Sequence, residues 1–575
     1  MRRLRLTPVQ LLALVGIAVA VATRLWGLAF GAHVPLARPD EEIFLLSGYS
    51  YFGTPAAAGT LGVTGWPMGF VRVVYLVERL ERLLYRTPSG AGANLGCLYL
   101  YRPAAIYLGV RLVSAAADLL TCLVVGFTAR RLARRDAAQL AFGFGVLAYA
   151  VNYLAGREAH NGMMNSALAL GIALSTLACV RAVQDSPWWL AAGGILAGAS
   201  FGIKYSAAPL LLVCLAAGVG ALRLRDRPGR TWAIGLLTIG AAIGGLWLSS
   251  PEIFTNLEPF QKGLLSAVGR YSPSFNGMLD LSYHHDPGWK FHLFTNLPIA
   301  FGWVGYLLAI AGLALALRDR GWEAAPVVAM ALGCAIMLAP VTQLFVRYAV
   351  PILPALAVGL ALAVTRLSML VHERVEGRLA AAVFSALAVL AFGPALVRLV
   401  QYDHLLSQPD TRELAGQWLL EHGGTGASIG YYQRVPLAEP SWEQACAGKI
   451  PAWAATTRLP ETPDHGPPFW RDLIDKEPDS LAQMTLDAAF KGNDLSAADY
   501  IFWPAPSVMC GKQGRIEGAE PSGQCFQFVD TISPGTAACH DLFDMFDSFF
   551  VPYAAFDGVV RPGPRVEIFK NLCKR

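Results

Sequence analysis

A short acidic cluster offers the clearest candidate chemistry in the chain. Residues 38–42 read Arg-Pro-Asp-Glu-Glu and follow an apolar stretch, residues 8–30, that is long enough to cross about 30 Å of hydrocarbon. The carboxylates of Asp40 and Glu41 should therefore lie where the membrane meets water. A carboxylate in that place can take a proton from a hydroxyl group that attacks a substrate whose headgroup lies at the membrane surface.

Cationic side chains near the ends of other apolar stretches can complement such a carboxylate. Arg102, Lys204 and Arg347 each lie at or near such an end. Arginine can bind a phosphate through two parallel hydrogen bonds, whereas lysine acts as a point charge. The alternative is that these long side chains only extend to the interface to keep their charges in water.

The segment SYHHDPGWKFH places two adjacent histidines, His284 and His285, near Asp286 and His292. These groups could contact a phosphate, and histidine together with carboxylate can also bind a divalent metal. However, adjacent histidines point to opposite sides of a strand, and the spacing fits no specific metal signature. We therefore predict no metal site, and a divalent metal stays an open alternative to phosphate contact by a histidine.

The composition favours a membrane protein over a soluble enzyme. Of the 575 residues, 54% are hydrophobic and only 15% are charged, and the mean hydropathy is +0.43. A soluble protein usually carries about 25% charged residues. The formal net charge of +5 is less informative than the positions of the arginines.

Eleven apolar stretches predict an α-helical polytopic membrane protein. The stretches are residues 8–30, 104–128, 137–156, 165–181, 188–203, 205–222, 231–249, 296–317, 324–342, 348–365 and 379–400. The short pair around Lys204 could instead be one broken helix. The first stretch is longer than the apolar core of a usual signal peptide and lacks a clear cleavage site, so we expect it to be retained.

Basic residues gather in alternate connections between these stretches. The clusters are Arg2, Arg3 and Arg5; Arg130, Arg131, Arg134 and Arg135; Arg181; Arg223, Arg225, Arg227 and Arg230; Arg318 and Arg320; and Arg366, Arg374 and Arg378. Cytoplasmic connections carry such an excess, which predicts a multi-pass protein of the inner (plasma) membrane with a cytoplasmic N-terminus. The Asp40 loop, Arg347 and the tail would then lie on the outer, periplasmic or extracellular, face.

The composition changes after residue 401. We predict a transmembrane domain over residues 1–401 and an extracytoplasmic soluble α/β domain over residues 402–575. Asp410 or Thr411 can cap a helix through RELAGQWLLEH, and the runs ASIGYY, DYIFWP and RVEIFK predict strands. An oxidising exterior would let four of the five cysteines of this tail pair; they are Cys446, Cys510, Cys525, Cys539 and Cys573.

Further polar residues lie within or beside the predicted spans. Arg111, Ser114 and Asp118 share one face of a helix, and an ion pair between helices explains them more simply than catalysis does. Glu158 and Asn165 lie in REAHNGMMNSAL at the start of the fourth span, where a helix cap with surface charges is at least as simple an explanation. Between the first two spans, GVTGWPMGFVRVVYLVERLERLLY predicts an amphipathic helix on the outer leaflet.

Five motifs give the chain a resemblance to a known superfamily. They are RPDEEIF, YLGVRLVSAAADLLTCLVVGFTARRLARRDAAQLA, LAGASFGIKYSAAPLLL, FVRYAVPILPALAVGLALAV and DTRELAGQWL. In this order, they resemble the GT-C integral-membrane glycosyltransferases, in the branch of protein O-mannosyltransferases, lipid A aminoarabinose transferases and their bacterial relatives. The resemblance covers most of the chain and implies the GT-C fold. Many relatives carry an acidic residue near the position that Asn165 holds here, and Glu158 could supply that carboxylate instead.

The resemblance implies transfer of a sugar from a polyprenyl-phosphate donor to an acceptor hydroxyl on the outer face, with inversion. The acceptor would be a glycolipid, a polysaccharide or a protein, and neither a nucleotide sugar nor a nucleic acid would take part. Asp40 matches the first acid of the family's loop pair and is the candidate general base, with Glu41 as second candidate or orienting partner. Candidates for binding the donor phosphate are Lys204, Arg347, Arg102, His284 and His285. The simpler alternative for the acidic run is a solvated loop or a helix cap.

A transporter or a lipid-linked sugar flippase is the main alternative, since it would also have about eleven spans with charges inside the membrane. Such proteins more often contain internal repeats with broken helices at matched positions, which the sequence does not show. A protein O-mannosyltransferase would differ in acceptor rather than in mechanism. A scaffold without catalysis would not need an acidic pair opposite cationic groups, so lipid-linked sugar transfer is our first hypothesis.

Overall fold

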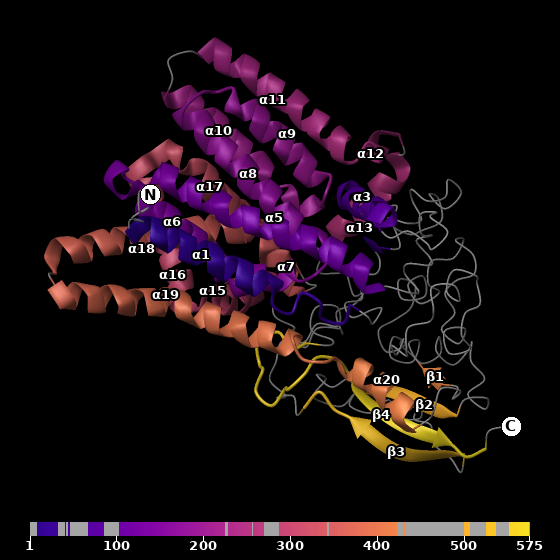
Figure 1. Cartoon of the computed structure of the whole chain (residues 1–575). Helices are drawn as coiled ribbons and strands as arrows, with labels where there is room; N and C mark the ends of the chain where they lie inside the picture. Colours follow the sequence, from indigo (N-terminus) through magenta and orange to yellow (C-terminus); the bar gives the residue numbers. More distant parts are fainter. Residues whose placement is uncertain are drawn as a thin grey trace.

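Helices dominate the computed structural model of the chain (Figure 1). The structure describes residues 8–32, 41, 44–45, 67–84, 103–224, 228–255, 257–269, 287–341, 344–375, 377–422, 429–431, 499–505, 525–535 and 551–573. The helices are α1 (Pro8–Leu25), α3 (Gly69–Leu84), α5 (Pro103–Leu132), α6 (Ala138–Ala150), α7 (Tyr153–Ala159), α8 (Met164–Gln184), α9 (Trp189–Phe201), α10 (Leu210–Leu224), α11 (Pro228–Ser249), α12 (Glu252–Thr255), α13 (Leu257–Gly269), α14 (Gly288–Phe291), α15 (Leu297–Phe301), α16 (Trp303–Arg320), α17 (Ala325–Leu338), α18 (Leu353–Arg374), α19 (Gly377–Leu406) and α20 (Thr411–His422). Short helical turns are η2 (Arg135–Ala137), η3 (Tyr205–Ala207), η5 (His292–Asn296), η6 (Gly321–Glu323) and η7 (Val346–Ile352).

Many of these helices are long and apolar enough to cross a membrane. In the described part of the chain, five segments qualify alone: Ala104–Leu132, Met164–Gln184, Tyr205–Leu224, Val346–Arg374 and Gly377–Leu419. Two pairs qualify only together, because each is bent at a short break: Arg135–Ala150 with Tyr153–Ala159, and Gly288–Phe301 with Trp303–Glu323. Shorter apolar helices are Gln10–Leu25, Trp189–Phe201, Ala233–Ser249 and Ala325–Leu338. A helix lies within each predicted stretch, whereas the number of eleven crossings stays a prediction.

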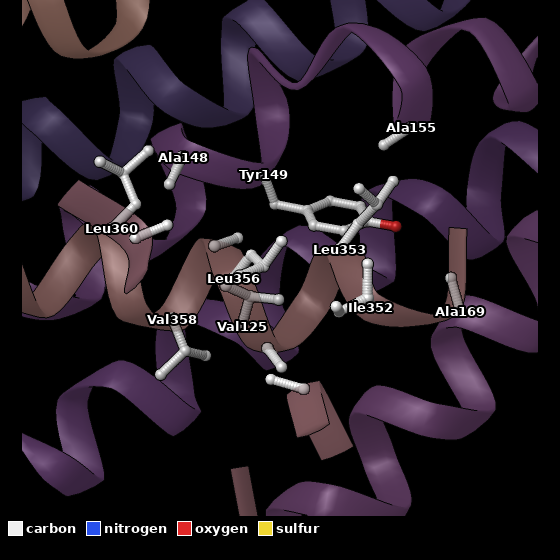
Figure 2. Packing of buried hydrophobic residues seen from close by; sticks show 14 of the residues in the cluster. Val125, Ala148, Tyr149, Ala155, Ala169, Ile352, Leu353, Leu356, Val358 and Leu360 are labelled. Carbon is white, nitrogen blue, oxygen red and sulfur yellow. The ribbon is translucent and has the colours of Figure 1, made fainter. Parts of the chain in front are cut away.

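The centre of the bundle forms around α18. In the segment Val346–Arg374, 89% of the most apolar part is buried. Figure 2 shows Tyr149 of α6 and Val125 of α5 in one buried cluster with Leu353 of α18. Gly312 brings α16 close to α18, because a Cβ atom there would lie 1.8 Å from the carbonyl oxygen of Gly359. Close packing of this kind is what holds helices together in lipid, where the hydrophobic effect between helices is absent.

Three of the connections that carry clustered arginines, those after α5, α8 and α16, meet at one end of the bundle. Arg131, near the end of α5, pairs with Asp185, which follows α8, at 2.8 Å. Arg320, at the end of α16, donates to the carbonyl oxygen of Leu132 at 3.0 Å. The alternation predicted from the arginines therefore agrees with which helix ends share a side. Which of the two sides is cytoplasmic stays a prediction.

Beyond α19, the chain forms α20 and a four-stranded sheet. The strands are β1 (Ile429–Tyr431), β2 (Tyr500–Ala505), β3 (Phe526–Ile532) and β4 (Arg565–Asn571), in the order β1-β2-β4-β3. β1 lies parallel to β2, and the other neighbours are antiparallel. Trp418 and Leu419 of α20 pack with Phe502, Val566 and Ile568 of β2 and β4. This small core is distinct from that of the bundle.

The sequence predicts α20 and three of the four strands, and the structure confirms them. Asp410 caps α20, since its Oδ1 accepts a hydrogen bond from the Arg412 backbone N–H at 2.8 Å. β3 is largely exposed and gives little periodic signal, so the sequence does not predict it. Cys525 and Cys573 form a disulfide that joins the start of β3 to the end of β4, and the other tail cysteines lie outside the described residues. α19 continues past residue 401, and the separate status of the tail stays a prediction.

The predicted amphipathic helix is present as α3, with exposed leucines on one face and buried glutamates on the other. Leu76, Leu80 and Leu83 point outward and are 64%, 56% and 70% exposed, whereas Glu78 and Glu81 are buried. A Cβ atom at Gly109 of α5 would lie 2.0 Å from Glu81 Oε1, so glycine makes room for this carboxyl. Burial, together with the neighbouring Glu81, raises the pKa of Glu78 to about 9, and burial raises the pKa of Glu81 to about 8.

These shifts predict a stability that falls with rising pH. Between pH 4.5 and about 9, folded Glu78 holds a proton that the unfolded chain releases, so the free energy of unfolding decreases across this window. We expect Glu78→Gln to remove this loss and to raise the Tm at pH 9 by several degrees, with little change at pH 5. The measurement is thermal unfolding in detergent at both pH values. Glu373→Gln, at an exposed site, is the control, and a Glu78→Gln variant that follows the wild type at both pH values would contradict the assignment.

Candidate functional site

Three predicted site residues lie within the described part of the chain: Glu41, Lys204 and Arg347. They lie at the end of the bundle opposite the arginine loops, with Glu41 beyond α1, Lys204 between α9 and η3, and Arg347 in η7. Asp40, Arg102, His284 and His285 lie outside the described residues. The structure therefore shows the side chains around the predicted site rather than all of its members.

Glu41 forms a buried ion pair with Arg111 of α5. Arg111 Nε donates to Glu41 Oε1 at 2.8 Å, and Nη2 donates to Oε2 at 2.7 Å. The backbone N–H of Gly162, between α7 and α8, donates to the same Oε1 at 2.6 Å. Arg111 also donates to the carbonyl oxygen of Leu28 at 3.0 Å. Both carboxylate oxygens of Glu41 are thus hydrogen-bonded. These contacts hold Glu41 against α5 and against the α7–α8 connection.

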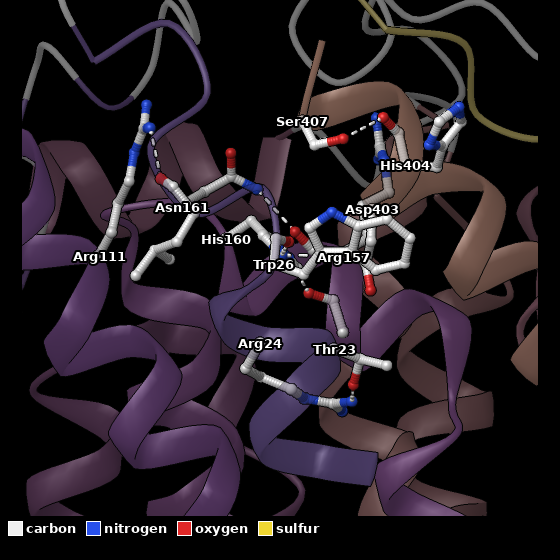
Figure 3. Close-up of polar contacts among 12 residues, drawn as sticks. Thr23, Arg24, Trp26, Arg111, Arg157, His160, Asn161, Asp403, His404 and Ser407 are labelled. Atoms are coloured by element: carbon white, nitrogen blue, oxygen red, sulfur yellow. Dashed lines mark hydrogen bonds and ion pairs between the residues drawn. The ribbon is translucent and has the colours of Figure 1, made fainter.

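A second buried ion pair lies about two turns further along α5. Arg24 of α1 donates through Nε to Asp118 Oδ2 at 2.7 Å, and both side chains are buried. Between the two pairs, Ser114 Oγ donates to the carbonyl oxygen of Met163 at 3.2 Å. The prediction that Arg111, Ser114 and Asp118 form a structural face with internal ion pairs is confirmed. Figure 3 shows Arg24 and Arg111 at different levels of the bundle.

Lys204 belongs to a chain of polar contacts that leads into the bundle. Its Nζ donates to Asn165 Oδ1 at 2.9 Å, and Asn165 Nδ2 donates to Glu158 Oε2 at 2.6 Å. Nζ also lies 5.6 Å from the centre of the Tyr348 ring. Asn165 is fully buried in the first turn of α8, where it joins the cation of the α9–η3 connection to a carboxylate of α7. The structure thus brings together Glu158 and Asn165, which the sequence only places near each other.

Arg347 lies on η7, directly before Tyr348. Its side chain is only 6% exposed, and its guanidinium carbon lies 4.4 Å from the centre of the Phe345 ring. Because Lys204 lies near the Tyr348 ring, one predicted phosphate-binding cation approaches the short turn that carries the other. Neither of these contacts with aromatic rings neutralises a full charge.

The turn after α7 carries a further polar group, which is drawn in Figure 3. His160 Nδ1 lies 2.8 Å from the carbonyl oxygen of Gly156, and Nε2 lies 2.9 Å from that of Trp26. Asp403 of α19 places its Oδ1 3.5 Å from His160 Nε2. Asp403 follows the last apolar stretch closely, and this position next to a span is the one signal by which the sequence could have singled it out.

Two further polar residues, Asn296 and Tyr553, are not singled out by the sequence analysis. Together with the polar side chains described above, they form a group that we call the buried polar layer. Its other members are Arg24, Glu41, Arg111, Asp118, Glu158, His160, Asn165, Lys204, Arg347 and Asp403. Asn296 of η5 donates through Nδ2 to the carbonyl oxygen of Val346, and accepts from the hydroxyl of Tyr553 at 2.6 Å. Tyr553 comes from the tail, and no sequence pattern predicts that a tail residue enters the bundle. Its ring lies 5.1 Å from the guanidinium carbon of Arg157.

This layer contains both carboxylates and cations, and the described contacts of the two kinds differ. Glu41 and Asp118 are taken up by two arginines, while Lys204 contacts an amide and Arg347 lies over a ring. Within the ranges that the structure describes, no three His, Cys, Asp or Glu side chains are grouped so that they could hold a metal ion. Positive groups at the end of a helical bundle can hold a phosphate at the membrane surface.

The Glu41–Arg111 pair predicts a large loss of stability on removal of one partner. Glu41→Gln would leave the Arg111 charge buried without its counter-ion, and we expect the free energy of unfolding to fall by about 3 kcal/mol or more. Asp185→Asn removes the partner of a half-exposed pair with Arg131 and should cost less than about 1 kcal/mol. Chemical or thermal unfolding of the purified variants measures both. Equal losses for the two variants would show that the Glu41 pair does not hold the structure together.

Comparisons with known proteins bear on this arrangement. Residues 106–251 match the family model described as dolichyl-phosphate-mannose-protein mannosyltransferase. No curated protein sequence matches the chain. Among solved structures, the chain is similar to the apo oligosaccharyltransferase of Archaeoglobus fulgidus, with 14% identity, 88% of this chain and 70% of that chain covered, and a TM-score of 0.46. It is also similar to ArnT from Cupriavidus metallidurans bound to undecaprenyl phosphate, with 16% identity, 72% of each chain covered and a TM-score of 0.45.

The family match spans about a quarter of the chain, from α5 to the end of α11. It contains two of the five motifs quoted above, and also Arg111, Glu158, Asn165 and Lys204. The residues of the buried polar layer that lie on α5 to α9 are therefore in the matched part. The resemblance to GT-C membrane glycosyltransferases that the motifs indicate is confirmed by this match.

Proposed function

We propose that the chain moves a sugar from a polyprenyl-phosphate donor to an acceptor hydroxyl at the outer face of the membrane, with inversion. The observation that carries this proposal is that Lys204 approaches η7, the turn that carries Arg347, at the same end of the bundle as Glu41. Glu41 is the sequence neighbour of Asp40, the proposed base. The description of the matched family names a sugar on dolichyl phosphate, which supports a polyprenyl-phosphate donor.

In the proposed reaction Asp40 takes the proton of the acceptor hydroxyl as the hydroxyl oxygen attacks the anomeric carbon. The new carbon–oxygen bond forms on the face opposite the phosphate, and the bond from the anomeric carbon to the phosphate oxygen breaks. A single displacement of this kind inverts the configuration. A positioned carboxylate base typically contributes a factor of about 100 to 10,000 to the rate.

The leaving polyprenyl phosphate takes the electron pair of the broken bond, so negative charge grows on its oxygen. Lys204 and Arg347 are proposed to stabilise this charge, with Arg102, His284 and His285 as further candidates. Positive groups fixed before the reaction stabilise such a charge without paying for reorganisation of solvent. Asn165 and the aromatic rings of η7 limit the freedom of these cations.

The acceptor hydroxyl would belong to a glycolipid, a polysaccharide or a protein. The proposed orientation places the N-terminus in the cytoplasm and the tail on the periplasmic or extracellular face of the inner membrane. It rests on the pattern of the arginine clusters; among the described members, Arg131 and Arg320 lie at the bundle end away from Lys204. The tail, next to the proposed site, is then on the side where the acceptor is found.

Asp40→Asn tests the proposed base. We expect sugar transfer to fall at least about 100-fold, because the amide cannot take the proton. The measurement is transfer of labelled sugar from purified polyprenyl-phosphate sugars to lipid and peptide acceptors. Asp319→Asn, at an exposed carboxylate at the opposite end, is the control and should transfer normally. Full activity in Asp40→Asn would remove Asp40 from the mechanism, and no transfer by the intact protein across the panel would favour a transporter or flippase.

Lys204→Met tests the proposed phosphate contact. The variant keeps the length and apolar stem of the side chain but loses its charge, so we expect the KM for the donor to rise about tenfold or more. Lys262→Met removes an equal charge from an exposed pair with Glu258 and should leave the KM unchanged. Steady-state kinetics at varied donor concentration separates the two. A normal donor KM in Lys204→Met would show that Lys204 only supports the fold.

A further inference from the structure

The tail sends one short segment, Val551–Phe556, into the helical bundle. The side chains of Val551 and Tyr553 belong to the same buried cluster as α6, α8 and α18, and Tyr553 is fully buried. Figure 1 shows the end of α19 beside the orange and yellow tail. A residue that follows β3 in sequence therefore completes the core of helices that precede the sheet.

Tyr553 is held by polar and aromatic contacts from two parts of the bundle. Its hydroxyl donates to Asn296 Oδ1 at 2.6 Å, and its carbonyl oxygen accepts a hydrogen bond from the hydroxyl of Tyr153. Its ring centre lies 5.5 Å from that of Tyr153, and the Arg157 guanidinium carbon lies 5.1 Å from it. Phe556 adds an edge-to-face contact with Tyr153.

From Asn296, the contacts lead to Arg347. Asn296 Nδ2 donates to the carbonyl oxygen of Val346 at 2.8 Å, and Val346 is the first residue of η7 and the direct neighbour of Arg347. The hydroxyl of Tyr553 and the backbone of Val346 thus bind opposite ends of one amide. Without the tyrosine hydroxyl, this amide would lose a hydrogen bond that fixes its orientation.

From Arg157, the contacts lead to Lys204. Arg157 precedes Glu158, whose Oε2 accepts from Asn165, whose Oδ1 accepts from Lys204. Tyr553 therefore lies where two short routes meet, one to each of the two proposed phosphate-binding cations. Its backbone carbonyl binds α7, and its side chain binds η5.

Beyond Phe556, the chain that follows the segment is fastened near β3 and to α20. Val560 N donates to the carbonyl oxygen of Pro534, which follows β3, at 2.9 Å. Thr411, at the start of α20, donates through its backbone N–H to Pro562 at 3.0 Å and through Oγ1 to Pro564 at 2.6 Å. The chain that follows the segment is thus tied next to β3 and to α20, so a short stretch of backbone links Tyr553 to the sheet.

We propose that Tyr553 is a positioning residue of the donor-phosphate site, through which the tail holds Lys204 and Arg347 in place. This inference rests on the proposed function, since it concerns the same phosphate. The alternative is that Tyr553 only fills space in the core. The two differ in what they predict for donor binding, because a space-filling tyrosine would affect the fold without a selective effect on the phosphate.

Tyr553→Phe separates the two, because it keeps the ring beside Arg157 and removes only the hydrogen bond to Asn296. We expect the Kd for undecaprenyl phosphate, used as the probe, and the KM for the donor to rise about tenfold, with kcat nearly unchanged. Tyr500→Phe is the matched control, because Tyr500 packs on Trp418 within the tail. Purified full-length proteins are compared in lipid nanodiscs by binding titration, kinetics and thermal unfolding.

Asn296→Ala tests the route to Arg347. If Tyr553 acts through Asn296, then Asn296→Ala raises the same Kd, and adding Tyr553→Phe to it raises the Kd no further. Independent, additive losses in the double variant would overturn the proposed route. The double variant also distinguishes this route from a general loosening of the tail, because loosening would add its own increase in Kd to that caused by Asn296→Ala.

Three other outcomes decide the matter. A Tyr553→Phe protein with normal undecaprenyl phosphate binding, in a wild type that transfers sugar, overturns this inference and leaves the proposed function standing. Equal weakening by Tyr500→Phe and Tyr553→Phe shows an unselective effect of the tail and overturns it as well. A wild-type protein that neither binds undecaprenyl phosphate nor transfers sugar overturns the proposed function, and this inference falls with it.

Discussion

The bidentate ion pair between Arg111 and Glu41 is the interaction on which the candidate site depends. A guanidinium buried between apolar helices is costly unless its charge is matched and its donors are bound. Here the match is made by a residue from another segment, and the same carboxylate also accepts the backbone N–H of Gly162. One charged contact therefore fixes three separate segments: the loop after α1, the start of α5 and the α7–α8 connection.

α5 makes further polar contacts of this kind along its length. Arg111, Ser114 and Asp118 lie on one face and bind, in turn, Glu41, the carbonyl of Met163 and Arg24 of α1. Each partner comes from a different part of the chain. This face of α5 therefore fixes the positions of neighbouring segments and also pairs with their charges. Arg24 and Arg111 pair with Asp118 and Glu41, and nearer the bundle end Lys204 donates to Asn165 while Arg347 lies over the Phe345 ring.

The sequence predicts those parts of the structure that depend on local pattern. The apolar stretches, the polar face of α5, the cap at Asp410 and the strand RVEIFK each depend on residues a few positions apart, and each is present. The partners across the fold are not local, and the sequence does not identify them. No sequence pattern near Arg111 identifies Glu41 as its partner, and none near Asn296 identifies Tyr553, because those contacts depend on how distant segments pack. For the same reason, the sequence does not predict that Glu78 and Glu81 of α3 are buried.

The entry of Tyr553 into the bundle has a consequence for biosynthesis. The helices up to α19 emerge from the ribosome well before residue 553, and until then the Tyr153 hydroxyl and Asn296 Oδ1 lack the partner that they have in the finished protein. Domains generally fold in the order of synthesis. Here, the packing of the helical bundle is completed only when a segment near the end of the chain has been made. Premature arrest of translation within the tail would leave an inserted bundle with an open polar gap, a ready substrate for membrane quality control.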